Sequence, residues 1–183
     1  MKTLVMNGNP DSQGQEFERH VDGFVRNLES FGHEVTRIDL RNLDIKFCTG
    51  CWSCWWATPG KCVFKDDMLQ IYPAMVESDL VVWASPLVLG NVSALTKTAQ
   101  DRFIPLVHPY IEIVDGECHH RKRYAHNAKV GLLVGPSPDD TVEDLALVRQ
   151  LFERFAKNCR SEFTLFSATK TLTAEVLNET LAG

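Results

Sequence analysis

The chain has 183 residues, of which 44% are apolar and 23% are charged, and its formal net charge is −5. These values predict a single globular domain, residues 1–183, and exclude a disordered chain. No long basic tract indicates a nucleic-acid partner, and no apolar run is long enough to cross a bilayer. Six cysteines without a recognisable secretion signal favour the reducing environment of the cytoplasm.

The N-terminal part of the chain has the pattern of a strand, a turn and a helix. Residues 3–7 predict a short buried strand, and the stretch from Gly8 to Gly14 is rich in turn-forming residues. Apolar residues then recur at intervals of four and three, which predicts one helix face: Phe17, Val21, Phe24, Leu28 and Phe31. We expect this helix to end at Gly32, and its first turn to offer backbone N–H groups to an anion.

A cysteine-rich loop follows the second predicted strand, residues 34–40. Four of the six cysteines have the pattern Cys48-x2-Cys51-x2-Cys54-x7-Cys62. Thiolates are preferred ligands of iron–sulfur clusters and zinc, and a two-residue gap also suits a dithiol–disulfide pair. The residues alone therefore leave a cluster, a zinc site, redox-active thiols and inert thiols open. Three tryptophans interleave with these thiols, where they would shield a cluster or face a flat cofactor: Trp52, Trp55 and Trp56.

The next predicted elements are a helix, a central strand and another helix. Asp66-Asp67 is expected to cap the first helix, with a kink or a broken first turn at Pro73. Residues 80–84 form a continuous apolar run, as in a parallel strand covered on both faces. The turn at 85–91 then leads to a helix capped by Ser93.

Residues 104–127 interrupt this alternation, because the stretch is too long for an ordinary connection. Asp115-Gly116 is a hairpin turn signal, so we predict an inserted β-hairpin that contacts another copy of the chain. Neighbouring residues on a strand point to opposite faces, so His119 and His120 are not expected to share one metal ion.

Two further strands, 129–134 and 162–166, complete a doubly wound sheet of five parallel strands, and a short last helix is expected at 172–181. Ligands of such sheets bind outside the carboxyl ends of the strands. Three predicted turns fall at those ends: 8–15, 85–91 and 135–139. We expect the cysteine loop at the same edge, because it follows the second strand.

These turns and the cysteine pattern resemble the flavodoxin-like NAD(P)H-dependent FMN reductase superfamily, and within it the iron–sulfur flavoproteins. The likeness covers nearly the whole chain. Its specific parts are the cysteine motif with Asp66-Asp67-Met68, and Ser85-Pro-Leu-Val-Leu-Gly90 with Asp101-Arg102. The resemblance implies an α/β, flavodoxin-like sheet with the hairpin inserted before the fourth helix–strand unit.

The resemblance also implies where cofactors would bind. The FMN phosphate would lie at residues of the first turn: Asn9, Ser12, Gly14 and Gln15. The flavin ring would lie along the other two turns: Pro86, Leu87, Val88, Leu89, Gly90, Asn91, Gly135 and Pro136. Gly90 is expected to let the backbone approach the ring closely. The four-cysteine motif, Cys48, Cys51, Cys54 and Cys62, would carry a [4Fe-4S] cluster.

The implied function is an FMN-dependent oxidoreductase, active as a homodimer or homotetramer, with small-molecule electron donors and acceptors. It would take electrons from NAD(P)H and pass them to a small acceptor or to the cluster. An alternative from a different class is a flavin-free module that acts through thiol redox chemistry or metal binding. Asp11 and Glu16 depart from the family pattern, because they place carboxylates near the phosphate turn. Their repulsion of a phosphate dianion predicts that FMN binds loosely.

Overall fold

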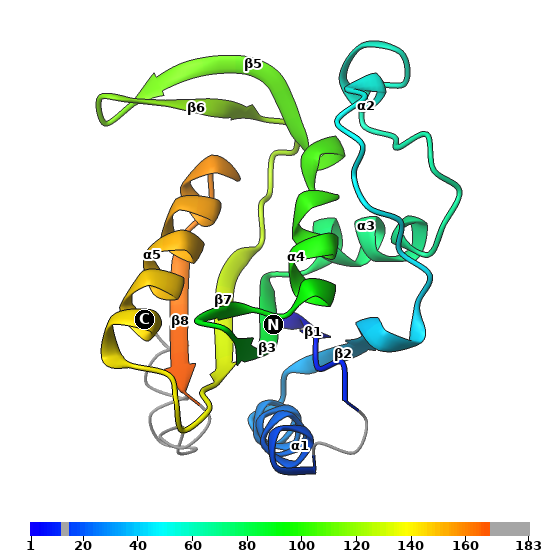
Figure 1. Cartoon of the computed structure of the whole chain (residues 1–183). Helices are drawn as coiled ribbons and strands as arrows, with labels where there is room; N and C mark the ends of the chain where they lie inside the picture. The colour runs from blue at the N-terminus through cyan, green and yellow to red at the C-terminus, as the bar shows by residue number, and fades with distance from the viewer. Residues whose placement is uncertain (12–14, 169–183) are drawn as a thin grey trace.

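The computed structural model describes residues 1–11 and 15–168 (Figure 1). Its main sheet holds five parallel strands in the order β2-β1-β3-β7-β8, which is the strand order of flavodoxin-like folds. The strands are β1 Lys2–Asn7, β2 Glu34–Asp39, β3 Leu80–Val88, β7 Lys129–Gly135 and β8 Phe163–Ala168. This confirms the predicted fold class. The helix expected at 172–181 lies outside the described residues.

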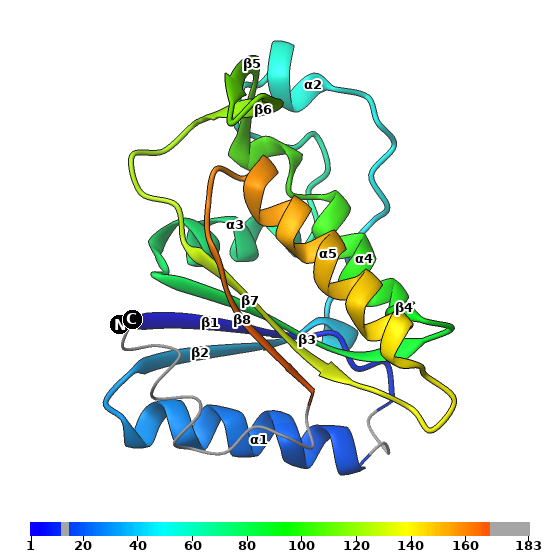
Figure 2. The same ribbon diagram turned by 90° about the vertical axis from the view of Figure 1, so that its left-hand side faces the viewer.

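Helices cover both faces of the sheet (Figure 2). One face packs against α1 Gln15–Ser30, and the other packs against three helices: α3 Met68–Glu77, α4 Ala94–Asp101 and α5 Val142–Asn158. Strand residues alternate between two cores, as the period of two requires. Val5 belongs to the core under α1, whereas Leu4 and Met6 belong to the core under the other helices.

Helix ends follow the predicted capping residues at some positions and depart from them at others. Ser93 Oγ accepts the backbone N–H of Thr96 and caps α4, as predicted. Asp67 lies at the N-cap of α3 but its side chain makes no capping bond. Of the predicted pair, Asp66 binds the helix start, because its Oδ1 accepts the backbone N–H of Met68 at 3.3 Å. The same carboxylate of Asp66 also binds Arg102. Pro73 lies inside α3, which runs from Met68 to Glu77 without the predicted break in its first turn.

The inserted hairpin is present as predicted. It consists of β5 Val107–Val114 and β6 Glu117–Lys122, which pair antiparallel and are preceded by the short helix η2 Ile104–Leu106. Asp115 and Gly116 form its turn with φ values of 52° and 80°. Both positive values suit a two-residue turn that matches the twist of the strands.

The cysteine loop lies beside this hairpin and not at the carboxyl edge of the sheet, so the predicted location is wrong. After β2 and the short helix η1 Leu40–Asn42, the chain passes the helix layer to reach α2 Ser53–Trp56 (Figure 1). Trp55 Nε1 donates to the carbonyl oxygens of Ile104 and Val107, each at 3.1 Å. These tertiary bonds hold the loop at the carboxyl end of α4. Within the described part of the chain, none of the helices combines the length and apolarity needed to cross a membrane.

Candidate functional site

Three strand-to-helix turns meet at the carboxyl edge of the sheet, as predicted. The backbone N–H of Gly8 donates to the carbonyl of Ala84 at 2.7 Å, which joins the β1 turn to β3. Pro86 of β3 lies in register with Gly135 of β7, which joins the second turn to the third. The strand order reverses between β1 and β3, and this is the position at which doubly wound sheets bind ligands.

The side chain of Asn9 forms hydrogen bonds within the first turn. It is 3% exposed, its Nδ2 donates to Asp11 O and to Glu18 Oε1 at 2.8 Å each, and its Oδ1 accepts from Asp11 N at 3.1 Å. Asn9 therefore orders the turn, and its amide is not turned toward solvent. Ser12 and Gly14 lie outside the described residues, as does the side chain of Gln15.

Glu18 forms the centre of a polar network behind this turn, which the sequence did not reveal. Its carboxylate accepts from Asn7, from Arg37 at 2.6 Å and from Arg41 at 2.7 Å. Burial alone would raise the pKa of Glu18, but these hydrogen bonds and that from Asn9 together hold it below its usual value. Both guanidinium groups are therefore paired beside the first turn. The signal for Glu18 in the sequence was its position as a charged residue next to the apolar face of α1.

The second turn is a tight hairpin and not an open loop. Strand β3 continues to Val88, and β4 Asn91–Val92 returns antiparallel to it. Leu89 and Gly90 at the tip have φ values of 52° and 72°, and the Leu89 side chain is fully exposed. An exposed leucine in the left-handed region is unusual, and such backbone strain concentrates at functional sites.

At Gly90 and Gly135, neighbouring side chains of the same chain occupy the space that a Cβ atom would need. A Cβ atom at Gly90 would lie 2.7 Å from Asp144 Oδ1 of α5. A Cβ atom at Gly135 would lie 2.4 Å from the ring of Phe17 in α1. These glycines let the helices approach the turns, which is a different reason from the close approach to a flavin that we expected for Gly90.

All four cysteines of the motif line one small pocket. Cys48 and Cys51 are exposed, Cys62 is partly buried and Cys54 is buried. Burial raises the pKa of the Cys54 thiol, and the neighbouring sulfur atoms of the motif raise it further. Within residues 1–11 and 15–168, however, no three His, Cys, Asp or Glu side chains are arranged to hold a metal ion.

Arg102 closes this pocket with a buried positive charge. Its side chain is 2% exposed, and it forms a two-pronged ion pair with Asp66, with N–O distances of 2.6 and 3.0 Å. It also donates to Lys46 O at 2.7 Å and to Cys62 Sγ at 3.3 Å. Its Nε has no hydrogen-bond partner among the residues that the structure describes. The sequence pattern Asp101-Arg102 was recognised, but its partner Asp66 was interpreted as a helix cap.

The hairpin histidines point apart, as predicted for neighbours on a strand. His119 is buried, with Nε2 3.0 Å from Glu117 Oε2 and Nδ1 3.1 Å from Asn158 Oδ1. The ring of His120 lies 5.2 Å from that of Trp55. His119 therefore ties the hairpin to α5 and is not placed with His120 around a metal ion.

Comparisons with known proteins agree with the sequence resemblance. The family described as NADPH-dependent FMN reductase matches residues 1–165. An iron-sulfur flavoprotein of Archaeoglobus fulgidus is 36% identical over 108 residues, covering 59% of this chain and 48% of that protein. An iron-sulfur flavoprotein of Methanosarcina thermophila is 30% identical over 139 residues, covering 75% of this chain and 64% of that protein. The chain spans about half the length of most of the curated relatives it matches.

The fold is shared with solved oxidoreductase structures. An NAD(P)H:quinone oxidoreductase from Methanothermobacter marburgensis superposes with a TM-score of 0.64, covering 100% of this chain and 92% of that one. The two sequences are 14% identical, so this likeness concerns the fold alone.

Proposed function

This chain belongs to the NADPH-dependent FMN reductase family, and we propose that it is a flavin-dependent oxidoreductase that takes electrons from NAD(P)H. FMN would bind at the carboxyl edge of the sheet. The electrons would pass to a small acceptor or to an iron–sulfur cluster held by the four cysteines of the loop.

The observation that carries this proposal is the meeting of three turns where the strand order reverses. Pro86 and Gly135 lie side by side on neighbouring strands, and Leu89 projects from the same edge. A bound flavin supplies the hydride chemistry, and the protein supplies orientation and electrostatics. The apolar side chains of Val88 and Leu89 would cover the ring from water, and Asn91 would offer it a polar side chain.

The phosphate end of the site determines how tightly FMN is held. Asp11 and Glu16 are both exposed, so water screens their charges more than it would in a closed pocket. Titration of the apoprotein with FMN compares the wild type with the combined variant Asp11→Arg and Glu16→Thr. Tighter binding of FMN by the variant would support the prediction that charge repulsion weakens FMN binding in the wild type. Equal affinity would mean that the carboxylates do not face the phosphate.

The donor set at the cysteine pocket fits an iron–sulfur cluster better than a single metal ion. No three His, Cys, Asp or Glu side chains of the described residues are arranged to hold a single metal ion. A four-iron cluster binds each thiolate to a different iron atom, so the thiols need not converge on one point. Four thiols around one pocket and an N–H donor on Cys62 Sγ match that requirement. The relatives named iron-sulfur flavoprotein support the same proposal.

The test is the spectrum of anaerobically purified protein, together with assays for iron and acid-labile sulfide. Bound flavin gives two resolved bands, and a cluster adds a broad absorbance that bleaches on reduction. Cys54→Ser should abolish iron binding, whereas Cys118→Ser, on the exposed hairpin outside the motif, should retain it. Wild-type protein without iron or sulfide would contradict the cluster, and protein that binds no flavin would contradict the oxidoreductase.

One observation favours the alternative of a flavin-free thiol module. The Cys51 thiol is exposed, and hydrogen bonds from the backbone and side chain of Ser53 hold its pKa below the usual value. Such thiols are reactive toward oxidants. If the anaerobic protein is colourless and Cys51 reacts with a disulfide reagent faster than Cys118, the thiol module is the better assignment.

A further inference from the structure

The buried arginine at the end of helix α4 lies against the cysteine pocket. Arg102 follows Asp101, the last residue of α4, and lines that pocket together with all four cysteines of the motif. The backbone carbonyls at the carboxyl end of a helix favour a positive charge nearby, and a guanidinium keeps its charge over the whole physiological pH range. The end of α4 therefore brings a permanent cation to the wall of the cysteine pocket.

The Asp66 carboxylate fixes the direction in which this cation points. Its two oxygens lie 2.6 Å from Nη1 and 3.0 Å from Nη2 of Arg102. The carboxylate is itself held by the backbone N–H groups of Lys46, at 3.0 Å, and Met68, at 3.3 Å. Because the donors of a guanidinium form a rigid planar fork, two bonds to one carboxylate determine its orientation.

This orientation directs one N–H group of Arg102 at the sulfur of Cys62. Each terminal nitrogen of a guanidinium carries two N–H groups. Nη1 donates to Asp66 and to Lys46 O, and Nη2 donates to Asp66 and to Cys62 Sγ at 3.3 Å. The guanidinium is therefore the member of the ion pair that contacts the sulfur.

The contact between Arg102 and Cys62 suits a sulfur that carries negative charge. A neutral thiol is a weak hydrogen-bond acceptor, whereas hydrogen bonds between ionised partners are much stronger. Arg102 Nε has no hydrogen-bond partner among residues 1–11 and 15–168, so the burial of this cation is incompletely compensated. A sulfur bound to a metal is deprotonated, and it would supply the negative charge that a neutral thiol lacks.

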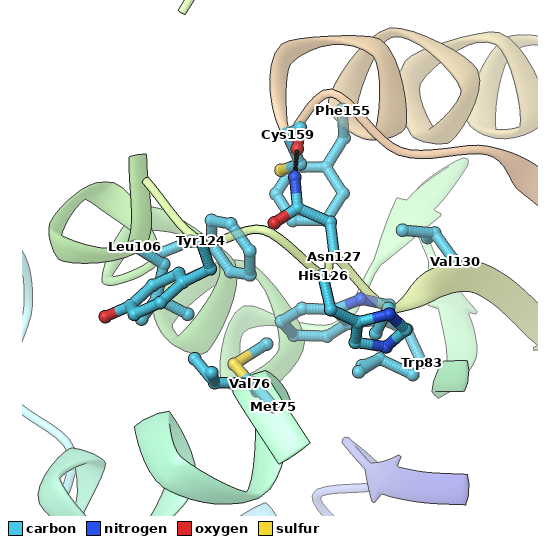
Figure 3. A pocket seen from close by; sticks show the side chains of 13 residues that line it. Met75, Val76, Trp83, Leu106, Tyr124, His126, Asn127, Val130, Phe155 and Cys159 are labelled. Carbon is cyan, nitrogen blue, oxygen red and sulfur yellow. Dashed lines mark hydrogen bonds between the residues drawn. The ribbon is translucent and has the colours of Figure 1, made fainter. Parts of the chain in front are cut away.

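The cysteine at the end of α5 lies in a different environment. Cys159 is also buried, and it lines a cavity of about 40 Å³ next to Trp83 and Tyr124 (Figure 3). Within the described part of the chain, neither a lysine nor an arginine lines that cavity. Burial raises the pKa of the Cys159 thiol, as expected for a packed and inert cysteine. The arginine beside Cys62 is therefore not a general consequence of burying a cysteine.

From these contacts we infer that Arg102 is a positioning residue that makes the cysteine centre easier to reduce, because it holds a positive charge and an N–H group on the Cys62 sulfur. The inference rests on the proposed cluster and adds a residue that sets its reduction potential. Reduction transfers one electron to the centre, and the reduced flavin that supplies this electron is oxidised by one electron. Hydrogen bonds to sulfur and net charge both set the potential of such centres, and Arg102 contributes to both.

Removing one charge from either member of the ion pair should shift the reduction potential in opposite directions. Arg102→Met removes the cation and leaves the carboxylate of Asp66, so the centre should become harder to reduce. Asp66→Asn leaves the cation without its counter-ion, so the centre should become easier to reduce. At a fixed potential, the ratio of reduced to oxidised centre should change at least about tenfold in each variant. A purely structural ion pair would not produce shifts of opposite sign.

The test is a redox titration of the anaerobically purified whole chain, in which electron paramagnetic resonance follows the cluster separately from the flavin. Arg102→Lys keeps the positive charge and should stay closer to the wild type than Arg102→Met does. The combined variant Asp66→Asn with Arg102→Met leaves no charge unpaired, so its potential should lie between those of the two single variants. These two variants keep the test decisive if Arg102→Met does not fold.

Arg149 and Glu153 provide the matched control, because they form another pair between an arginine and a carboxylate. Their N–O distance is 2.9 Å, their side chains are 56% and 40% exposed, and neither residue lines the cysteine pocket. Arg149→Met and Glu153→Gln remove the same two kinds of charge from a pair that water and salt screen. Each should change the ratio of reduced to oxidised centre by less than about twofold.

Three results would overturn the inference while the wild type still binds iron. They are an unchanged potential in Arg102→Met, shifts of the same sign in Arg102→Met and Asp66→Asn, and equally large shifts in the control variants. In each case the proposed cluster would stand and the role of Arg102 would not. Wild-type protein without iron or acid-labile sulfide would refute the cluster itself, and the inference with it.

Discussion

Replacing Asp66 with asparagine tests the buried ion pair that joins the cysteine loop to helix α4. The Asp66 side chain is 0% exposed and that of Arg102 is 2% exposed, so neither charge is solvated by water. Asp66→Asn keeps the shape of the side chain but leaves the guanidinium of Arg102 buried without its counter-ion. Breaking a buried pair from one side costs about 3 to 5 kcal/mol.

This cost is large enough to measure by thermal unfolding. For a protein of this size each kcal/mol lowers Tm by about 2 to 4 °C, so Asp66→Asn should lower Tm by roughly 6 to 20 °C. Asp101→Asn is the matched control, because Asp101 is adjacent to Arg102 in sequence but pairs with Lys97 at a half-exposed site. Such helix pairs contribute about 0.3 to 0.5 kcal/mol.

Two further measurements separate the ion pair from general packing. Combining Asp66→Asn with Arg102→Met should cost less than the sum of the single variants, because no charge is then left unpaired. Burial alone would raise the pKa of Asp66, but hydrogen bonds from Arg102 and Lys46 N hold it below its usual value. A lowered folded-state pKa stabilises the protein above the unfolded-state pKa, and this contribution is lost as pH falls through the folded-state value.

The difference in stability between the wild type and Asp66→Asn should therefore shrink as the pH falls below about 4. Equal Tm values for Asp66→Asn and Asp101→Asn at neutral pH would refute the reasoning. A difference that stays constant into acid would refute the assignment of the effect to the ionised carboxylate.

Three other predictions concern the turns and the hairpin. Glu18→Gln should lower the free energy of unfolding by about 1 to 3 kcal/mol in urea denaturation, because four donors lose a charged acceptor; an unchanged midpoint would count against the network. Leu89→Gly should raise the free energy of unfolding by about 0.5 to 1 kcal/mol, because the backbone strain that is relieved exceeds the cost of the added entropy of the unfolded chain. Destabilisation would show that the leucine is not strained. Ile111 and Ile113 are 51% and 69% exposed on the hairpin. Replacing both with lysine should dissociate the proposed homo-oligomer in light scattering, and a monomeric wild type at micromolar concentration would contradict that contact.

The fold was predictable because its signals are local. Runs of apolar residues marked the buried strands, and the spacing of residues such as Val21, Phe24 and Leu28 marked the face of α1. Ser93 and Asp115-Gly116 determine a helix start and a hairpin turn through their own backbone and side-chain chemistry. The meeting of the three turns followed from the parallel topology alone.

The side-chain partners within the site were not predictable in this way. Asp66 is 36 residues from Arg102, and either of two neighbouring aspartates fitted the pattern of a helix cap. Asn9 was interpreted as a ligand of the phosphate, because its bond to Glu18 appears only when α1 packs beside the turn. These choices depend on which groups face one another after the helices dock.

The cysteine loop likewise has one property that the sequence determines and another that depends on tertiary contacts. The sequence by itself determined that four thiols occupy one short segment after β2, and therefore that they remain close to one another. Only the tertiary structure decided that this segment crosses the helix layer and docks beside the hairpin. The physical reason is that a loop has no periodic sequence pattern to indicate its direction. Its position is set by the hydrogen bonds of Trp55 to Ile104 and Val107, which join residues about 50 positions apart and exist only in the folded chain.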